Sequence, residues 1–291
     1  MVRSSIHTHT SFCDGSGSVE DFCRAAFEKG FVSLGFSAHA PAAKKTGMTT
    51  GWHLPEEKLE EYLDTVRAAK RRWAGTLDVY LGLEVDYISG IMGPADKDYR
   101  EMGLDYIIGS VHYIVPPKAL PFTVDGPPDE LEAGLKGFGG DREGLVNAYW
   151  DAVEEMTRLG GFDVLGHPDL IKKNNAGERI FSPSAAFYQK RLWDIAALAG
   201  HSGLAAEINT GGMNRQKTPD PYPSLPLLRL FLENNVPMTI NSDAHRPEDL
   251  DGHYPDAVRA LVNAGYTEAV VFVGSKNGKA QWKNEPLARF S

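Results

Sequence analysis

The chain has 291 residues, of which 42% are apolar and 24% are charged, a composition typical of a globular enzyme. Its net charge of −9 disfavours a general nucleic-acid or anionic-membrane surface, and no apolar run reaches the length of about 18 residues that a membrane-spanning helix needs. The first residues lack the apolar region of a signal peptide, and Cys13 and Cys23 are expected to be free thiols, so a cytoplasmic location is predicted.

Short apolar runs alternate with amphipathic stretches along the chain. Ser18 and Asp21 form a capping pattern at the start of the first amphipathic stretch, and Gly30 ends it. The apolar runs predict strands over 4–6, 32–36, 78–83, 106–111, 164–166, 204–208, 238–240 and 269–273. The amphipathic stretches predict helices over 18–30, 55–73, 96–102, 141–159, 183–200, 223–234 and 254–264.

The segment from Ile114 to Gly140 interrupts this rhythm. It is rich in proline and glycine, and no clear apolar period runs through it. An irregular segment of this length inside a compact domain is usually a functional loop or a mobile one. We therefore expect a loop here that borders the functional site.

Seven or eight strand–helix units in strict alternation predict a parallel sheet. The chain length, the absence of a linker and the regular rhythm favour a single domain over residues 1–291, folded as a closed barrel and not as an open doubly wound sheet. No Gly-x-Gly-x-x-Gly or Walker segment follows a predicted strand, so a Rossmann or P-loop nucleotide site is not favoured.

Side chains that bind metals stand at the ends of the predicted strands. His7 and His9 are two residues apart at the end of the first strand, so both imidazoles face the same way and form a bidentate clamp. In a barrel the carboxyl ends of the strands converge on one face, where such residues would meet. The others at equivalent positions are His39, Glu84, His112, His167, Asp243 and His245.

Six imidazoles and several carboxylates exceed the four ligands of one tetrahedral ion, so at least two divalent ions are predicted. Mixed nitrogen and oxygen ligands suit Zn, Fe or Mn, and Glu84 is the natural bridging carboxylate. A pair of ions about 3.5–4 Å apart typically clamps a phosphoryl group and activates water. Asp14 is a further candidate ligand, with a turn-capping role beside Gly15 as the alternative.

Three other histidines, His53, His201 and His253, do not follow strand ends. We interpret them as solvated or structural, although His53 lies in a loop that could touch substrate.

Taken together, the ordered motifs resemble those of the PHP superfamily, and within it the histidinol-phosphate phosphatases of the PHP type. The resemblance extends from His7 to about Pro255 and implies a distorted (β/α)7 TIM-like barrel with a trinuclear metal site. It also implies hydrolysis of L-histidinol phosphate in histidine biosynthesis. The motifs are His7-Thr-His9, Ser37-Ala-His39, Gly82-Leu-Glu84-Val-Asp86, Gly109-Ser-Val-His112, Gly166-His167-Pro-Asp169, Glu207-Ile-Asn209-Thr-Gly-Gly and Ser242-Asp243-Ala-His245.

Carried over residue by residue, the resemblance implies three ions. The first would be held by His7, His9, Glu84 and Asp243, the second by Glu84, His112 and His167, and the third by Asp14, His39 and His245. Many close relatives place a histidine one position after Asp14, where this chain has Gly15, so Asp14 or a neighbour completes the third site.

Substrate binding needs further cations on the same face. Arg215, Lys172 and Lys173 follow predicted strands and are expected to bind phosphate, and Asn209 is a further candidate substrate ligand. A metal-bound hydroxide would attack phosphorus, with Glu84 bridging the ions, and Asp243 or His245 would protonate the leaving alkoxide.

Other functions stay open at this point. The same residues would serve a PHP phosphoesterase that acts on another small phosphomonoester or a nucleotide. A barrel amidohydrolase also begins with His-x-His, but it typically carries a carboxylated lysine after the fourth strand, where this chain has His112. A metal-binding regulatory subunit would be favoured by an incomplete ligand set. The metal identity and the oligomeric state are not determined by the sequence.

Overall fold

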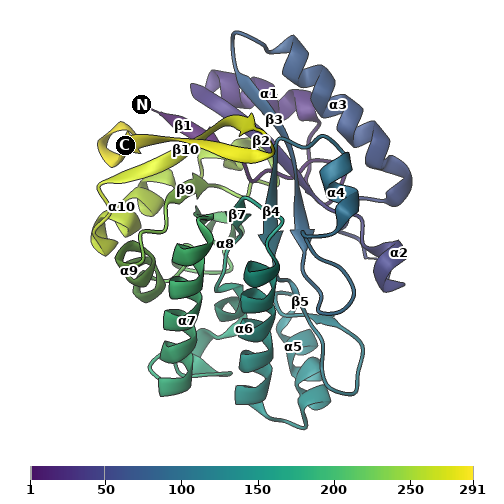
Figure 1. Ribbon diagram of the computed structural model, residues 1–291, viewed down its shortest axis with the longest axis vertical. Helices are drawn as coiled ribbons and strands as arrows, with labels where there is room; N and C mark the ends of the chain where they lie inside the picture. The colour runs from purple at the N-terminus through teal and green to yellow at the C-terminus, as the bar shows by residue number, and fades with distance from the viewer. Residues whose placement is uncertain (1, 49, 291) are drawn as a thin grey trace.

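A sheet of parallel strands forms the centre of the computed structural model, which describes residues 2–48 and 50–290 (Figure 1). Seven strands are hydrogen-bonded in the order β1-β2-β3-β4-β7-β8-β9, which confirms the predicted seven-stranded TIM-like barrel. Their bounds are β1 (Arg3–Ser5), β2 (Phe31–His39), β3 (Asp78–Asp86), β4 (Tyr106–Ser110), β7 (Val164–Leu165), β8 (Ala205–Asn209) and β9 (Met238–Asn241).

The two edges of this sheet meet between β1 and β9. Residues Thr8 and Ala244 form a parallel bridge, and the backbone nitrogen of His9 donates to the carbonyl oxygen of Ala244 at 2.9 Å. Three residues before His9 and Ala244, the backbone nitrogen of Ile6 donates to Oδ1 of Asn241 at 2.9 Å. The barrel is therefore nearly closed at the point where the first two predicted metal ligands lie.

Helices on the outside of the sheet connect its strands (Figure 1). The predicted cap of the first helix is present, because Oγ of Ser18 accepts from the backbone nitrogen of Asp21 at 3.2 Å. No helix within the described ranges is long and apolar enough to cross a membrane. The main helices are α1 (Val19–Glu28), α3 (Leu59–Arg72), α4 (Lys97–Glu101), α6 (Arg142–Leu159), α7 (Ala186–Ser202), α9 (Leu225–Glu233) and α10 (Tyr254–Ala264), with short ones at α2 (Ala43–Thr46) and α8 (Gly211–Asn214).

The segment from Ile114 to Gly140, expected to be an irregular loop, carries regular structure. An antiparallel pair, β5 (Tyr113–Ile114) and β6 (Phe122–Thr123), is followed by α5 (Pro128–Leu135). Proline suits the first turn of a helix, where its missing N–H has no intrahelical partner in any case. Leu131 and Leu135 are buried and anchor the helix, so the prediction of an irregular segment was wrong for these residues.

The last predicted strand lies outside the barrel. Together β10 (Glu268–Lys276) and β11 (Lys279–Pro286) form an antiparallel hairpin. Phe272 of β10 packs against Tyr80 and Tyr106, with ring centroids 4.7 and 5.3 Å apart. These residues, with Ile6, form a cluster that closes the base of the barrel, at the amino ends of the strands.

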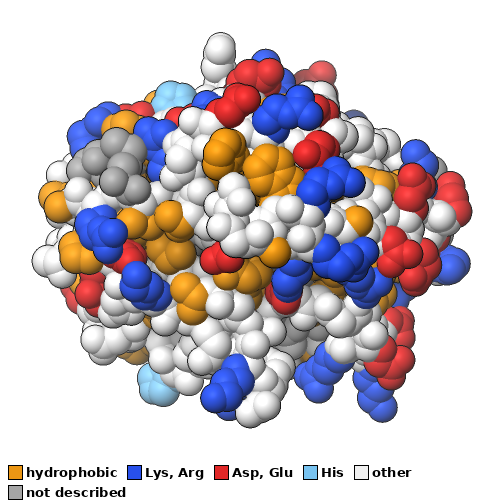
Figure 2. Space-filling view, turned by 90° about the horizontal axis from the view of Figure 1, so that it is seen from above, with side chains coloured by type: hydrophobic (Ala, Val, Ile, Leu, Met, Phe, Trp, Pro, Cys, Tyr) orange, Lys and Arg blue, Asp and Glu red, His pale blue; other side chains and the backbone are white. Residues whose placement is uncertain are grey.

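On the face seen from above in Figure 2, acidic and basic side chains are interspersed, a pattern typical of a solvent-facing surface.

Tyr106 fills the barrel interior because two glycines leave room for it. A Cβ atom at Gly82 would lie 2.5 Å from Cζ of Tyr106, and one at Gly35 would lie 2.5 Å from its hydroxyl oxygen. That hydroxyl donates to the carbonyl oxygen of Ile6. The interior layer below the site is therefore tightly packed around one aromatic ring.

We expect Gly82→Ala to lower the free energy of unfolding by about 1–3 kcal/mol, because the added methyl group overpacks this interior. Urea denaturation measures the change. Gly51→Ala is the control, since a Cβ atom at Gly51 meets nothing within 4 Å. Equal stability of the two variants would contradict the packing described for Tyr106.

Candidate metal centre

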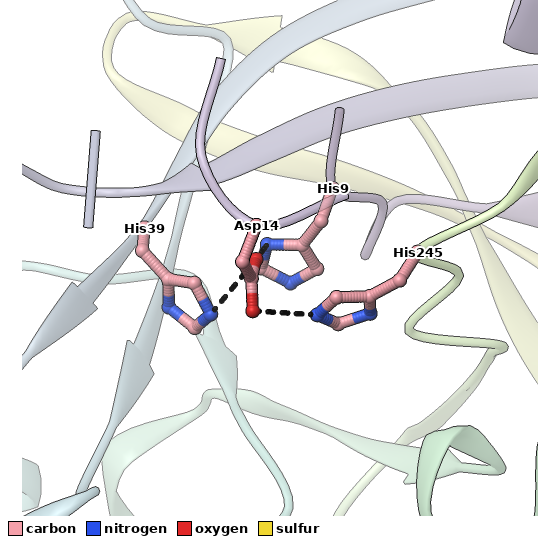
Figure 3. A group of neighbouring side chains, drawn as sticks. All are labelled: His9, Asp14, His39 and His245. Carbon is pink, nitrogen blue, oxygen red and sulfur yellow. Dashed lines mark hydrogen bonds and ion pairs between the residues drawn. The ribbon is translucent and has the colours of Figure 1, made fainter. Parts of the chain in front are cut away.

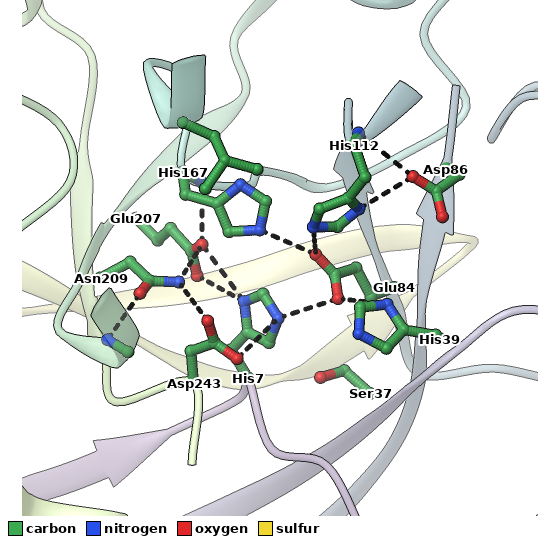
Figure 4. A network of polar contacts seen from close by, with 12 residues as sticks. His7, Ser37, His39, Glu84, Asp86, His112, His167, Glu207, Asn209 and Asp243 are labelled. Carbon is green, nitrogen blue, oxygen red and sulfur yellow. Dashed lines mark hydrogen bonds and ion pairs between the residues drawn. The ribbon is translucent and has the colours of Figure 1, made fainter. Parts of the chain in front are cut away.

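Glu84, at the carboxyl end of β3, lies at the centre of the predicted ligands (Figure 4). It is 1% exposed. Its Oε1 is 2.9 Å from Nε2 of His167 and 3.7 Å from Nε2 of His112. Its Oε2 is 2.9 Å from Nδ1 of His39 and 3.2 Å from Nε2 of His7. One buried carboxylate therefore faces imidazoles from four other strand ends.

Asp243 supplies a second carboxylate from the segment after β9. Its Oδ1 is 3.3 Å from Nε2 of His9 and 3.7 Å from Nε2 of His7. The backbone of Asp243 has a φ of +47°, which is uncommon for a residue with a side chain. The carboxylate also lies against Gly211, where a Cβ atom would be 2.4 Å from Oδ2. Glycine at this position thus lets Asp243 reach the cluster.

Asp14 lies among His9, His39 and His245 (Figure 3). Its Oδ2 is 3.1 Å from Nε2 of His245, and its Oδ1 is 3.8 Å from Nε2 of His39. At the next position, a Cβ atom on Gly15 would lie 2.3 Å from the carbonyl oxygen of His9. A side chain does not fit there without a shift of the backbone, so Asp14, and not position 15, faces these histidines.

Several buried atoms of this cluster face one another at ion-pair distances but make no hydrogen bond with any described residue. They are Nε2 of His7, Nε2 of His9, Nδ1 of His39 and Oε2 of Glu84. Buried polar atoms are nearly always paired, so unpaired atoms that face one another indicate a missing partner. The groups whose ligand atoms lie within 4.8 Å of one another are His9–Asp14–His39–His245, His7–His9–Asp243, His7–Glu84–His167 and His39–Asp86–His112. The donor set fits divalent cations.

Metal binding requires neutral imidazoles and ionised carboxylates. Burial opposes protonation of His7, His39 and His112, but the neighbouring carboxylates outweigh it and raise the pKa of each, so a bound cation would replace a proton at these imidazoles. Burial, together with the charges of His39 and His245, lowers the pKa of His9 to about 3. Burial opposes ionisation of Glu84, but the neighbouring imidazoles outweigh it and hold the pKa of this carboxyl well below its usual range.

Glu207 of β8 holds His7, one of the predicted ligands, in place, a role that the sequence analysis did not assign. Its Oε2 accepts from Nδ1 of His7 at 2.9 Å, and its Oε1 accepts from the backbone nitrogen of His167 at 2.9 Å. Asn241 donates to Oε2 at 2.8 Å. Such a carboxylate fixes the orientation and tautomer of a ligating imidazole.

Asp86 has the same role for His112 and was also missed. Its Oδ1 is 2.8 Å from Nδ1 of His112, and its Oδ2 is 3.0 Å from Nε2 of His53. Asp86 lies two residues after Glu84 and so on the same face of β3, which is the signal that could have identified it. His53 is buried and stacks on Trp52 at 3.8 Å, so it is structural, whereas His201 and His253 are exposed.

The substrate residues expected from the sequence divide into two groups. Arg215 and Lys173 line a cavity of about 960 Å³ above the cluster. Nη2 of Arg215 is 3.0 Å from Oδ2 of Asp243. Lys172 instead donates to the carbonyl oxygen of Pro221 at 2.7 Å and lies over the ring of Tyr222.

Asn209, the remaining candidate, is fully buried beneath the cavity. Its Nδ2 donates to Oε1 of Glu207 at 2.8 Å, and its Oδ1 accepts from the backbone nitrogen of Gly211 at 2.8 Å. Neither Lys172 nor Asn209 is therefore placed to bind substrate. A lysine or asparagine after a strand can turn to several partners, which the sequence alone does not decide.

Comparisons with known proteins agree with this geometry. The PHP domain family matches residues 5–211. A Deinococcus radiodurans protein named "Probable histidinol-phosphatase" is 32% identical over 260 residues, which cover 89% of this chain and 92% of that protein. A Listeria monocytogenes crystal structure assigned as a histidinol phosphatase has a TM-score of 0.78 at 23% identity, covering 87% of this chain and 99% of that one.

A second solved structure is the histidinol phosphate phosphatase of Lactococcus lactis, in complex with zinc, L-histidinol and phosphate. It has a TM-score of 0.64 at 18% identity and covers 97% of this chain and all of that one (100%). At this level of identity, the likeness to both structures concerns the fold.

We expect Asp86→Asn to weaken zinc binding by about 10- to 100-fold, because His112 loses the carboxylate that orients it. Competition with a chelating dye measures the affinity. Asp163→Asn is the control, since Asp163 accepts from the backbone nitrogen of Ile107 at 2.9 Å at the opposite end of the barrel. Equal zinc affinity in both variants would contradict the role of Asp86.

Proposed function

Since this chain belongs to the PHP family, we propose that it is a metal-dependent phosphomonoesterase that hydrolyses L-histidinol phosphate to L-histidinol and phosphate. The observation that carries this proposal is the convergence of imidazoles and carboxylates on one cavity, with unpaired buried atoms facing one another. The Deinococcus radiodurans relative supports the substrate. We also propose that the protein acts in histidine biosynthesis in the cytoplasm, with a small phosphorylated substrate as its partner.

The metal centre would hold two to three divalent ions. His7, His9, Glu84 and Asp243 would bind the first, Glu84, His112 and His167 the second, and Asp14, His39 and His245 the third. The zinc in the Lactococcus lactis structure supports zinc here, with iron and manganese as alternatives. Bound ions of this kind polarise a phosphoryl group and make water nucleophilic at neutral pH.

Arg215 would bind the phosphoryl oxygens from the side of the cavity. Its guanidinium is already oriented, because Nη2 is 3.0 Å from Asp243 and Nη1 is 2.9 Å from Nδ1 of His245. A planar guanidinium offers paired donors that match phosphate geometry. Lys173, which lines the same cavity, would add positive charge.

The leaving alkoxide needs a proton at the side of the phosphorus opposite to attack. Asp243 and His245 both line the cavity. Burial opposes ionisation of Asp243, but Arg215 and His7 outweigh it and hold the pKa of this carboxyl well below its usual range, so of the two expected donors we propose that His245 delivers this proton. His245 is the more accessible of the two, with 15% of its side chain exposed against 6% for Asp243. Glu84 lies beneath them. Through its contacts with the imidazoles, it would keep the metal centre positioned for the reaction.

Removal of metal by a chelator should abolish phosphate release, and Glu84→Ala and His112→Ala should lower turnover by about a thousandfold or more. The assay compares L-histidinol phosphate, a nucleoside monophosphate and an aryl phosphate. His201→Ala, at the exposed end of α7, is the matched control. Circular dichroism checks that the variants fold. Full activity in both site variants would contradict the assignment, as would metal-loaded protein that releases phosphate from none of the esters.

Arg215→Ala should lower kcat/KM for L-histidinol phosphate by about 10- to 100-fold, because charge-assisted hydrogen bonds to phosphate are lost. Inhibition by inorganic phosphate should weaken in parallel. Arg72→Ala is the control, because this side chain is 65% exposed, is paired with Glu20 and does not line the cavity. A similar small effect of both substitutions would show that Arg215 does not contact phosphate.

A further inference from the structure

The cavity above the metal centre has two chemically different ends. Arg215 lies beside Asp243 and His245, where a phosphate group is expected. The segment that joins β4 to α6 contributes another part of the wall, which includes the carboxylates of Asp125 and Glu130. An anionic surface there does not suit the phosphate, so it must meet another part of the substrate.

The backbone around Asp125 is held firmly next to the metal ligands. The backbone nitrogen of Val124 donates to the carbonyl oxygen of His112 at 2.8 Å. Nδ2 of Asn174 donates to the carbonyl oxygens of Val124 and Gly126, both at 3.0 Å. Asp125 is therefore fixed from both sides, directly beside His112.

The carboxylate of Asp125 keeps one oxygen free for a ligand. Nζ of Lys173 donates to the backbone oxygen of Asp125 at 2.6 Å and to Oδ2 at 3.1 Å. No described residue donates a hydrogen bond to Oδ1, and the side chain is 25% exposed. The ion pair with the Lys173 ammonium, 3.1 Å away, favours the anionic form of this carboxylate.

Two neighbouring groups extend this polar surface. The Tyr113 side chain lines the cavity and is 3% exposed, yet its hydroxyl oxygen has no hydrogen-bond partner among the described residues. The Glu130 carboxylate lies over Gly126, where a Cβ atom would be 2.3 Å from Oε2. An unpaired buried hydroxyl beside two carboxylates indicates that a polar ligand group completes this wall.

We propose that Asp125 binds the ammonium group of the substrate. It would thereby select phosphomonoesters that carry an ammonium group over those that carry none. This inference rests on the proposed function and deepens it. In L-histidinol phosphate the ammonium is on the carbon next to the CH₂ group that carries the phosphate ester. The phosphate group of the substrate would therefore lie at the metal centre beside Arg215, and its ammonium group would face Asp125.

The ammonium would donate to Oδ1 of Asp125, which the structure leaves without a protein donor, while Lys173 keeps its bonds to Oδ2 and to the backbone. Because the backbone is already fixed, little ordering accompanies binding, which favours selectivity. A sugar phosphate or an aryl phosphate has no cation at this position and would leave Asp125 without this partner.

Asp125→Asn tests this inference, because it removes the charge and keeps the shape. The zinc-loaded enzyme is assayed with L-histidinol phosphate and with its desamino analogue, 3-(imidazol-4-yl)propyl phosphate. We expect kcat/KM for L-histidinol phosphate to fall by about 10- to 100-fold, with no change for the desamino ester. Asp125→Glu, which restores the charge, should recover part of the loss.

Asp129→Asn is the matched control, because Asp129 belongs to the same segment and is exposed in the first turn of α5. It should leave both esters unaffected. If Asp125→Asn lowers both esters alike, or neither, the inference is wrong and the proposed function stands. If the wild type hydrolyses an aryl phosphate but neither imidazole ester, the proposed substrate is wrong and this inference fails with it.

Discussion

The pairing of one buried carboxylate with several imidazoles is the interaction on which this molecule depends. Glu84 is 1% exposed, and four of the imidazoles around it approach to between 2.9 and 3.7 Å. An isolated ionised carboxylate in a protein interior is strongly unfavourable, so Glu84 keeps its charge only through these neighbours and the cations that they fit. Four strands of the sheet, β1, β2, β4 and β7, each end at or just before one of these four imidazoles.

Around this centre, further carboxylate and amide side chains hold the predicted ligands in their orientations. Glu207 holds His7, Asp86 holds His112, and Asn209 joins Glu207 to the neighbourhood of Asp243. Below it, the interior is apolar and filled by Tyr106. The polar cluster is thus built on a rigid layer, which limits how far the ligands can move when ions or substrate bind.

Much of the fold and of the predicted metal centre could be read from the sequence, because the patterns that reveal them lie within short stretches of chain. A strand end is visible in the apolar pattern, and in a barrel all such ends converge, so His39 and His167 could be assigned to one place. Orientation is not local. Lys172 turns to Pro221, a contact between distant segments that the sequence does not reveal. The final apolar run pairs with the adjacent β11 in a hairpin and does not join the barrel. The strand pattern could place Asp86 near Glu84, but a carboxylate within a strand, such as Asp86 or Glu207, does not reveal which imidazole it meets.

The hairpin of β10 and β11 covers one end of the barrel, so only the other end is open to solvent. Phe272 and its aromatic neighbours seal the amino ends of the strands with apolar side chains, while the carboxyl ends open into a charged, wet cavity. A phosphate ester cannot pass through the barrel, so the alcohol and the phosphate both depart by the route along which the ester arrived. Both products therefore share one opening, and the product that lies deeper in the cavity can leave only when the other does not block its path.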